Sequence, residues 1–255
     1  MRFHLKPKSF LDESRRDWQF EAFAWMLRNC GGYAKFLETT LVLPTEEHFP
    51  DKGLKGHAAI AALFRRARDH AGMADWPCTV EPEREEPIDT GESGIRVFTY
   101  KKGSLEPISL VAGFGCNLAR FLVETFDEPA PGGEPQREAA VELAAVFMGF
   151  GIFMASSAVK HTRYQLSEGE LAHALALFCQ LRDLPEEEIE MHLNPHVRKH
   201  VRLAARDLAQ HELRFKKLRA TLAMTPEAAA EARSPSRPVK AAASPCRSTC
   251  SRRAA

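Results

Sequence analysis

The pattern of apolar positions along the chain predicts more helix than strand. The run DWQFEAFAWMLRNC (17–30) places apolar residues at helical spacing, and a double glycine follows where a C-cap belongs. A second helix is expected over 56–70, alanine-rich on one side and arginine-rich on the other. The β-branched run 39–42 indicates a brief strand or extended segment, and IRVFTY (95–100) is the clearest strand in the chain.

Two apolar segments in the middle of the chain predict two buried central helices. The first begins at Pro107, a residue that favours a first helical turn, and the second runs over 136–160. The charge-free stretch 143–159 is slightly short for a membrane span, so a buried core helix is favoured and no membrane partner is expected. Paired glycines at 113/115 and 149/151 would let these helices approach closely.

Capping chemistry marks the helices of the C-terminal third. Ser167 and Glu170 form a capping box for a helix over 168–181, and Asn194-Pro195 begins an amphipathic helix expected to reach about 222. These patterns together predict a predominantly helical α+β fold with a few short strands. We expect one globular domain over residues 1–225, followed over 226–255 by a disordered, basic tail rich in Ala, Ser, Pro and Arg.

Composition and charge narrow the possible partners and the compartment. The chain has 35 Lys+Arg and 34 Asp+Glu; the tail holds six basic and two acidic residues, which leaves 29 basic and 32 acidic residues in the body. A mildly acidic body makes nucleic acid an unlikely ligand. Six scattered cysteines and an N-terminus without an apolar export segment predict a cytoplasmic protein.

Strong catalytic motifs are absent from the sequence. No HExxH, GxxxxGK[ST], GxGxxG after a strand, or GxSxG occurs. The loop LPTEEHFPD (43–51) groups Glu46, Glu47, His48 and Asp51, which could bind a metal, although a solvated polar loop is the simpler interpretation.

Two further groups of residues have potential chemistry. His196 and His200 stand four apart on one predicted helix face, but the sequence offers no third metal ligand and basic residues surround them. Cys116 is a possible nucleophile with His57 or His161 as its base, although buried cysteines are usually inert.

Polar residues within the two apolar helices form the last constellation. Cys116 and Arg120 lie four apart on the first helix, and Glu138 and Glu142 lie four apart on the second. An unpaired buried charge costs several kcal/mol, so the arginine is expected to pair with one or both carboxylates. The sequence predicts a buried or partly buried ion pair of Arg120 with Glu138, and leaves open whether Glu142 shares it.

Several runs of this sequence resemble a family of uncharacterised bacterial proteins: FEAFAWMLRNCGGYAKFLETTLVLPTEEHFPD, HAGMADWPC, AAVFMGFGIFMASSAV and LSEGELAHALALFCQLRDL, all within residues 17–220. That family is similar to the gluzincin class of zinc metallopeptidases, with an HExxH helix at 116–120 and an ExxxD helix at 138–142. In gluzincins the two His and the Glu of the second helix hold zinc, the Glu between the His is the general base, and the Asp steadies a ligand. The resemblance implies a zincin-like fold.

The resemblance also implies a degenerate metal site. Cys116 and Arg120 replace the two His ligands, Asn117 replaces the general base, Glu138 is retained, and Glu142 replaces the Asp. An amide cannot accept a proton from water, and a guanidinium repels Zn²⁺. We therefore expect no catalytic residue, metal or other cofactor, and a pseudoenzyme whose cleft binds a peptide or protein. The alternative is an active hydrolase with an atypical metal or Cys116-dependent site.

Overall fold

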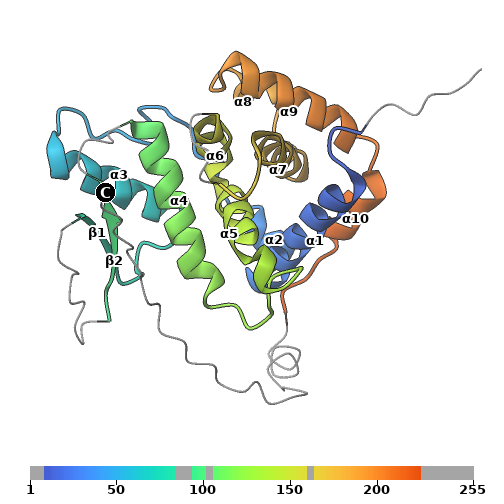
Figure 1. Ribbon diagram of the computed structural model, residues 1–255, viewed down its shortest axis with the longest axis horizontal. Coiled ribbons are helices and arrows are strands. Elements are labelled where there is room, and N and C mark those ends of the chain that lie inside the picture. The colour runs from blue at the N-terminus through green and yellow to red at the C-terminus, as the bar shows by residue number, and fades with distance from the viewer. Residues whose placement is uncertain (1–8, 84–93, 102–105, 160–163, 225–255) are drawn as a thin grey trace, which may run out of the picture.

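The structure is a computed structural model that describes residues 9–83, 94–101, 106–159 and 164–224. Helices dominate these ranges (Figure 1). The elements run in the order α1 (Glu13–Asn29), α2 (Gly32–Phe36), α3 (Gly56–His70), β1 (Cys78–Pro82), β2 (Arg96–Tyr100), α4 (Pro107–Val123), the 3₁₀ turn η2 (Glu134–Gln136), α5 (Arg137–Ala145), the π turn η3 (Val146–Phe150), α6 (Gly151–Ala158), α7 (Glu168–Leu181), α8 (Glu186–Glu190), α9 (Pro195–Leu208) and α10 (Glu212–Arg219). The prediction of a predominantly helical α+β fold is confirmed.

The helices pack in layers around the central α5–α6 segment. In Figure 1, α4 lies between this segment and the part of the molecule that holds α3 and the β1–β2 sheet. On the other side α7 packs against α6 and α9, while α1 contacts α5 and α10. Helix α4, the first of the two apolar helices, is therefore covered by α3 on one side and by the α5–α6 segment on the other, as expected for a helix with few charges.

The sheet is small and parallel. Strands β1 and β2 pair in register, with Val80 opposite Phe98, and α3 packs against β1. The strand predicted over 95–100 is confirmed, but 39–42 is not a strand. This segment has no regular secondary structure, and its Val42 N–H donates to the Gly149 carbonyl at 2.9 Å, which ties it to the α5–α6 segment.

The second apolar helix is interrupted, contrary to the prediction of one helix over 136–160. Helix α5 passes into the π turn η3, in which Gly149 has a φ of 98°, and α6 continues from Gly151. Only glycine adopts this conformation at low cost, so Gly149 is the residue that allows the helix to be interrupted here. The four residues 160–163 lie outside the described part of the chain.

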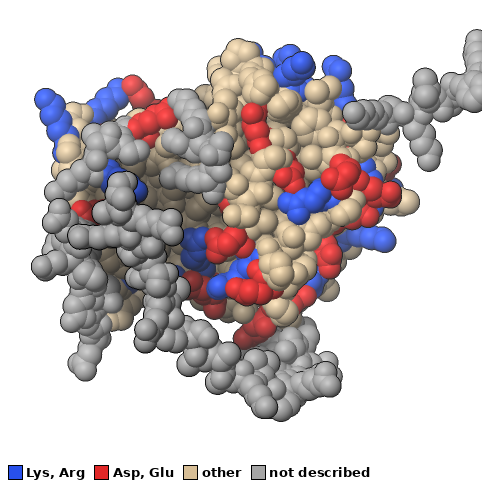
Figure 2. Space-filling view, in the orientation of Figure 1, with Lys and Arg blue, Asp and Glu red and all other residues tan. Residues whose placement is uncertain are grey.

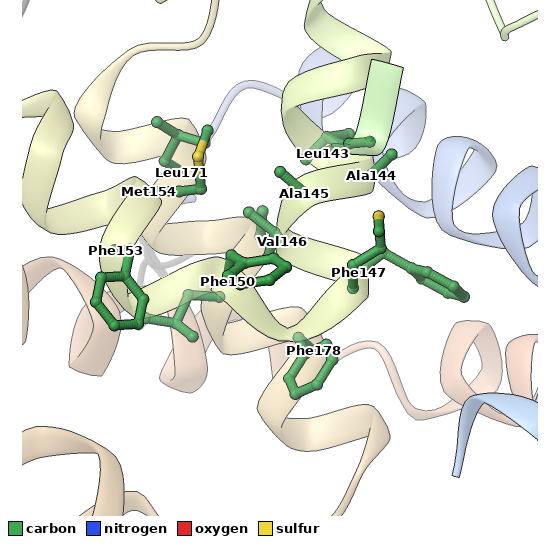
Figure 3. Close-up of a cluster of buried hydrophobic side chains, with 14 of the residues drawn as sticks. Leu143, Ala144, Ala145, Val146, Phe147, Phe150, Phe153, Met154, Leu171 and Phe178 are labelled. Carbon is green, nitrogen blue, oxygen red and sulfur yellow. The ribbon is translucent and has the colours of Figure 1, made fainter. Parts of the chain in front are cut away.

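Burial identifies the α5–α6 segment as core. The stretch Glu134–Ala158 is long and apolar enough to cross a membrane, but 94% of its most apolar window is buried inside the protein. Figure 3 shows its aromatic side chains, with those of Phe147, Phe150 and Phe153 among neighbours from α7 such as Phe178. Aromatic side chains of this size supply much of the hydrophobic stabilisation.

Caps fix the ends of three helices. Asp12 caps α1 by accepting from the Arg15 N–H at 2.9 Å, so α1 begins one turn before the predicted start at 17. The Ser167–Glu170 capping box begins α7, as predicted. Asn194 caps α9, but the amphipathic helix expected to reach 222 ends at Leu208, and α10 is separate. The predicted disordered tail, 226–255, lies outside the described residues.

Candidate functional site

A half-open pocket of about 240 Å³ lies between α4 and α5. All five positions that the resemblance assigned to the metal motif line it. The described lining residues are Cys116, Asn117, Arg120, Glu138, Val141, Glu142 and Tyr164. Residues from separate helices therefore converge on one solvent-accessible space.

Helical spacing and close packing position the pocket. Cys116 and Arg120 lie one turn apart on α4, as Glu138 and Glu142 do on α5. A Cβ at Gly115 would lie 3.0 Å from the Phe150 ring, so the glycine lets α4 approach the η3 turn. Of the paired glycines, Gly115 therefore makes the close helix approach that the sequence predicted, whereas Gly151 lies against the Leu175 side chain of α7.

Arg120 pairs with Glu138, but the pair is not buried. The guanidinium Nη2 donates to the Glu138 carboxylate, while 38% of the Arg120 side chain and 54% of the Glu138 side chain remain exposed. The predicted partner is confirmed. Of the two degrees of burial that the sequence left open, full burial is wrong: Arg120 is partly buried and Glu138 is exposed, so water screens the charges.

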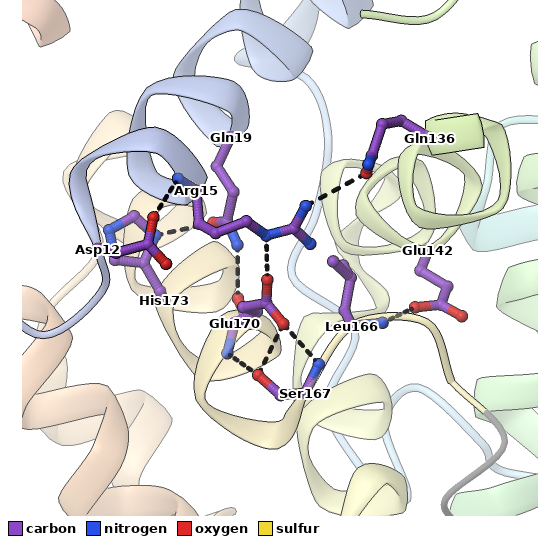
Figure 4. A network of polar contacts seen from close by, with 9 residues as sticks. All are labelled: Asp12, Arg15, Gln19, Gln136, Glu142, Leu166, Ser167, Glu170 and His173. Carbon is purple, nitrogen blue, oxygen red and sulfur yellow. Dashed lines mark hydrogen bonds and ion pairs between the residues drawn. The ribbon is translucent and has the colours of Figure 1, made fainter. Parts of the chain in front are cut away.

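Glu142 has different partners from those predicted. It is the buried carboxylate of the pocket, and its two oxygens accept the backbone N–H groups of Gln165 and Leu166, each at 2.8 Å. Figure 4 shows the bond from Leu166. Burial raises the pKa of Glu142, while the two amide hydrogen bonds act in the opposite direction. Glu142 therefore holds the segment that carries Tyr164 against α5 and is not part of the Arg120 pair.

The structure gives little support to a nucleophilic role for Cys116. Its Sγ lies 3.5 Å from the Sδ of Met154. His57 contacts the Tyr100 hydroxyl at 3.2 Å and is not among the residues that line the pocket, and His161 lies outside the described residues. Among the described lining residues there is no histidine that could act as the base.

A polar network joins α1 to the start of α7, and sequence reasoning missed it (Figure 4). Arg15 donates to Glu170, the capping-box carboxylate. Gln19 donates to the Glu170 carbonyl at 2.9 Å and accepts from His173 Nδ1 at 2.7 Å. The sequence did contain a signal for this network: Gln19 and His173 lie on otherwise apolar helix faces, and buried polar side chains need hydrogen-bond partners.

The loop 43–51 does not gather its polar residues into one site. Glu46 forms an ion pair with Lys52 at 2.5 Å, and His48 Nδ1 lies 3.1 Å from Thr45 Oγ1. Asp51 pairs with the arginines of α3, and the hydrogen bond from Arg66 lowers its pKa. These separate contacts agree with a solvated polar loop.

His196 and His200 do have a third potential ligand. Glu168, the first residue of α7, places its carboxylate against both rings, and the three ligand atoms lie within 4.8 Å of one another. This group was missed because α7 and α9 are separate in sequence and meet only by packing. Of the described residues, only this group has three such side chains close enough to hold a metal ion together.

A second cavity, of about 400 Å³, lies beside the C-terminal end of α3. Apolar and aromatic side chains such as Trp76, Phe126 and Met148 line much of it. None of the five residues that the resemblance identified contributes to this cavity. The α4–α5 pocket therefore remains the candidate site.

Neither sign of charge dominates the face of the molecule shown in Figure 2. On the face shown in Figure 2, basic and acidic side chains are interspersed. This distribution fits the near balance of the whole chain, which has a formal net charge of +1.

Comparisons with protein-family models, curated proteins and solved structures find no match to this chain.

Proposed function

We propose that this protein is a non-catalytic, zincin-like pseudoenzyme of the cytoplasm whose α4–α5 pocket binds a peptide or protein segment. The observation that carries the proposal is the convergence on one accessible pocket of all five residues at the degenerate motif positions. Two of the described cysteines, Cys30 and Cys78, are free thiols, which agrees with a reducing compartment.

The chemistry of the pocket favours binding over hydrolysis. The Arg120 guanidinium engages Glu138, the only retained zinc-ligand type, and a cation there opposes Zn²⁺. Both oxygens of Glu142 accept hydrogen bonds from backbone N–H groups, so this carboxylate has a structural role: it fixes the segment before α7. Asn117 lines the pocket but has no group that takes a proton from water.

Size and charge favour the end of a peptide as the ligand. A volume of about 240 Å³ is smaller than the pockets that enclose whole small molecules, so it suits a terminus or an anchoring side chain. An exposed ion pair opens at low cost, so a peptide carboxylate can replace Glu138 as the partner of Arg120. Guanidinium binds a carboxylate through two parallel hydrogen bonds, which supplies specificity.

The binding test uses a fluorescent pool of random tetrapeptides with free C-terminal carboxylates, and the same pool amidated. We expect saturable binding of the free acids that weakens at least tenfold, about 1.4 kcal/mol, on amidation or in Arg120→Ala. Arg66→Ala, which removes an arginine paired with Asp51 outside the pocket, is the matched control and should bind normally. Absence of saturable binding, or equal binding by Arg120→Ala, would contradict the proposal.

The catalytic test asks whether the pocket can be given a metal. In a His196→Ala, His200→Ala background, the triple change Cys116→His, Asn117→Glu and Arg120→His should gain about one zinc per chain. The same background without the triple change should hold no zinc and hydrolyse no peptide. Peptide hydrolysis by the wild-type chain that is lost in Cys116→Ser would instead support the Cys116-dependent hydrolase.

A further inference from the structure

The geometry points to a second site, unrelated to the pocket: a divalent transition-metal site formed by Glu168, His196 and His200 between α7 and α9. Zn²⁺ is the probe for this class of ion. The Glu168 Oε1 lies 3.0 Å from His196 Nε2 and 3.0 Å from His200 Nδ1. Two imidazoles and one carboxylate are a common ligand set for zinc and for other first-row transition metals.

The spacing of the ligand atoms fits one ion. Zinc binds nitrogen and carboxylate oxygen at about 2.0–2.2 Å, which places neighbouring ligands of a tetrahedral site about 3.3 Å apart. The two separations from the carboxylate oxygen, each 3.0 Å, need to widen by only a few tenths of an ångström. The third separation, between the two imidazole nitrogens, is at most 4.8 Å and is the one that movement of a ring must adjust. His196 is more than half exposed, so its ring has room to make this adjustment.

Both ligand-bearing helix turns are already fixed. Glu168 is the first residue of α7 and lies within the Ser167–Glu170 capping box. The Asn194 side chain accepts the backbone N–H groups of His196 and Val197, at 3.1 and 2.9 Å. A site whose ligands sit on capped, mutually packed helices loses little entropy when an ion binds.

The surroundings of the cluster limit the affinity. Phe10 packs against one side of His200, with ring centroids 5.9 Å apart, and restricts the movement of that ring. Arg198 and Lys199 neighbour the ligands on α9, and the positive ends of two helix dipoles lie close by. Three protein ligands leave a coordination position for water, so we expect reversible binding that is weaker than in a closed four-ligand site.

The alternative is an exposed Glu–His hydrogen-bonded group with no metal function. The same 3.0 Å contacts would then be two imidazole N–H groups that donate to one carboxylate. The two interpretations differ in their response to added metal. A bound ion would join α7 to α9 and raise the melting temperature, whereas hydrogen bonds alone would not respond to zinc.

The test is calorimetric titration of ZnCl₂ into the metal-free full chain, with Co²⁺ absorption as an independent report of the coordination geometry. We expect one zinc per chain and a higher melting temperature in zinc. His196→Ala, His200→Ala and Glu168→Gln should each weaken binding at least tenfold. His57→Ala, which removes a histidine on α3 outside the cluster, should bind as wild type does.

Two pocket variants separate this proposal from the function proposed above. Glu138→Gln and Cys116→Ser alter the α4–α5 pocket and should leave zinc binding unchanged. Zinc lost in these variants but kept in His196→Ala would assign the metal to the pocket and overturn both proposals. No saturable zinc binding, or equal binding in His196→Ala and His200→Ala, would overturn the metal site alone and leave peptide binding unaffected.

Discussion

Gly149 lies directly against the backbone of Thr40, so closely that a Cβ at Gly149 would overlap the Thr40 carbonyl oxygen. The Val42 N–H donates to the Gly149 carbonyl beside this contact. The turn that interrupts the central helix can therefore pack this closely against the segment 39–42 only because residue 149 has no side chain. A residue other than glycine would also face the cost of a φ of 98°.

Gly149→Ala is expected to lower the free energy of unfolding by at least about 3 kcal/mol, because backbone overlap adds to left-handed strain. Gly72→Ala is the matched control: its φ is 69°, and nothing lies within 4 Å of an added Cβ. It should cost only about 1 kcal/mol. Urea unfolding measures both, and equal losses in the two variants would show that the contact with Thr40 contributes nothing.

Arg120→Ala is expected to lower the free energy of unfolding by less than about 1 kcal/mol, because the ion pair with Glu138 is exposed. A buried pair would instead cost about 3–5 kcal/mol when one partner is removed. Thermal and urea unfolding of the single variant decide between these values. A loss above about 2 kcal/mol would mean that the pocket mouth is closed in solution.

Glu142→Gln should be the damaging change on α5. The substituted side chain keeps one carbonyl oxygen, which can replace only one of the two carboxylate oxygens that accept from Gln165 and Leu166, and its NH₂ group then faces the other N–H donor. We expect a loss of about 1–3 kcal/mol in the free energy of unfolding. Glu138→Gln makes the same chemical change one turn earlier at an exposed position and should cost under about 1 kcal/mol. The reverse order of the two losses would contradict this assignment.

His173 should make the protein less stable in acid. Burial is the largest cause that lowers its pKa from 6.5 to about 3, and the charge of Arg16 adds to the effect. The folded chain thus keeps His173 neutral while the unfolded chain binds a proton below pH 6.5. Stability from this residue is complete above pH 6.5 and falls, by up to about 1.4 kcal/mol per pH unit, as the pH drops toward 3.

His173→Gln isolates this contribution, because glutamine does not titrate and its amide can still donate toward Gln19. The free energy of unfolding, measured in urea from pH 7.5 to pH 5, should fall less steeply in the variant than in the wild type. His48 and His211, whose pKa values are also lowered mainly by burial, will leave a residual slope in both proteins. An identical slope in both would show that His173 is accessible to protons.

Much of the fold was predictable from short-range patterns. The helix predicted over 56–70 and the helix predicted over 168–181 have the bounds expected, and the strand over 95–100 is present. The break at Gly149 and the end of α9 at Leu208 were not predicted. The chain is apolar on both sides of Gly149, and apolar residues resume at Leu213 and Phe215 soon after Leu208, so the hydrophobic pattern alone does not mark either break.

The candidate site was predictable only in part. Helical spacing placed Cys116 and Arg120 on one face, and the partner of Arg120 was identified correctly. The exposure of that pair and the amide partners of Glu142 were not predictable. Both depend on where α4, α5 and the segment before α7 lie relative to one another, which no local pattern specifies.

The sequence by itself determined features that act within one or two helical turns. Capping by Ser167 and Asn194 requires only neighbours in the chain, because a cap bonds backbone groups two or three residues away. Tertiary structure alone decided which distant groups meet: Thr40 with Gly149, and Glu168 with His196 and His200. Such contacts are set by the packing of whole helices, whose energy is spread over many apolar side chains and is not encoded in any single motif.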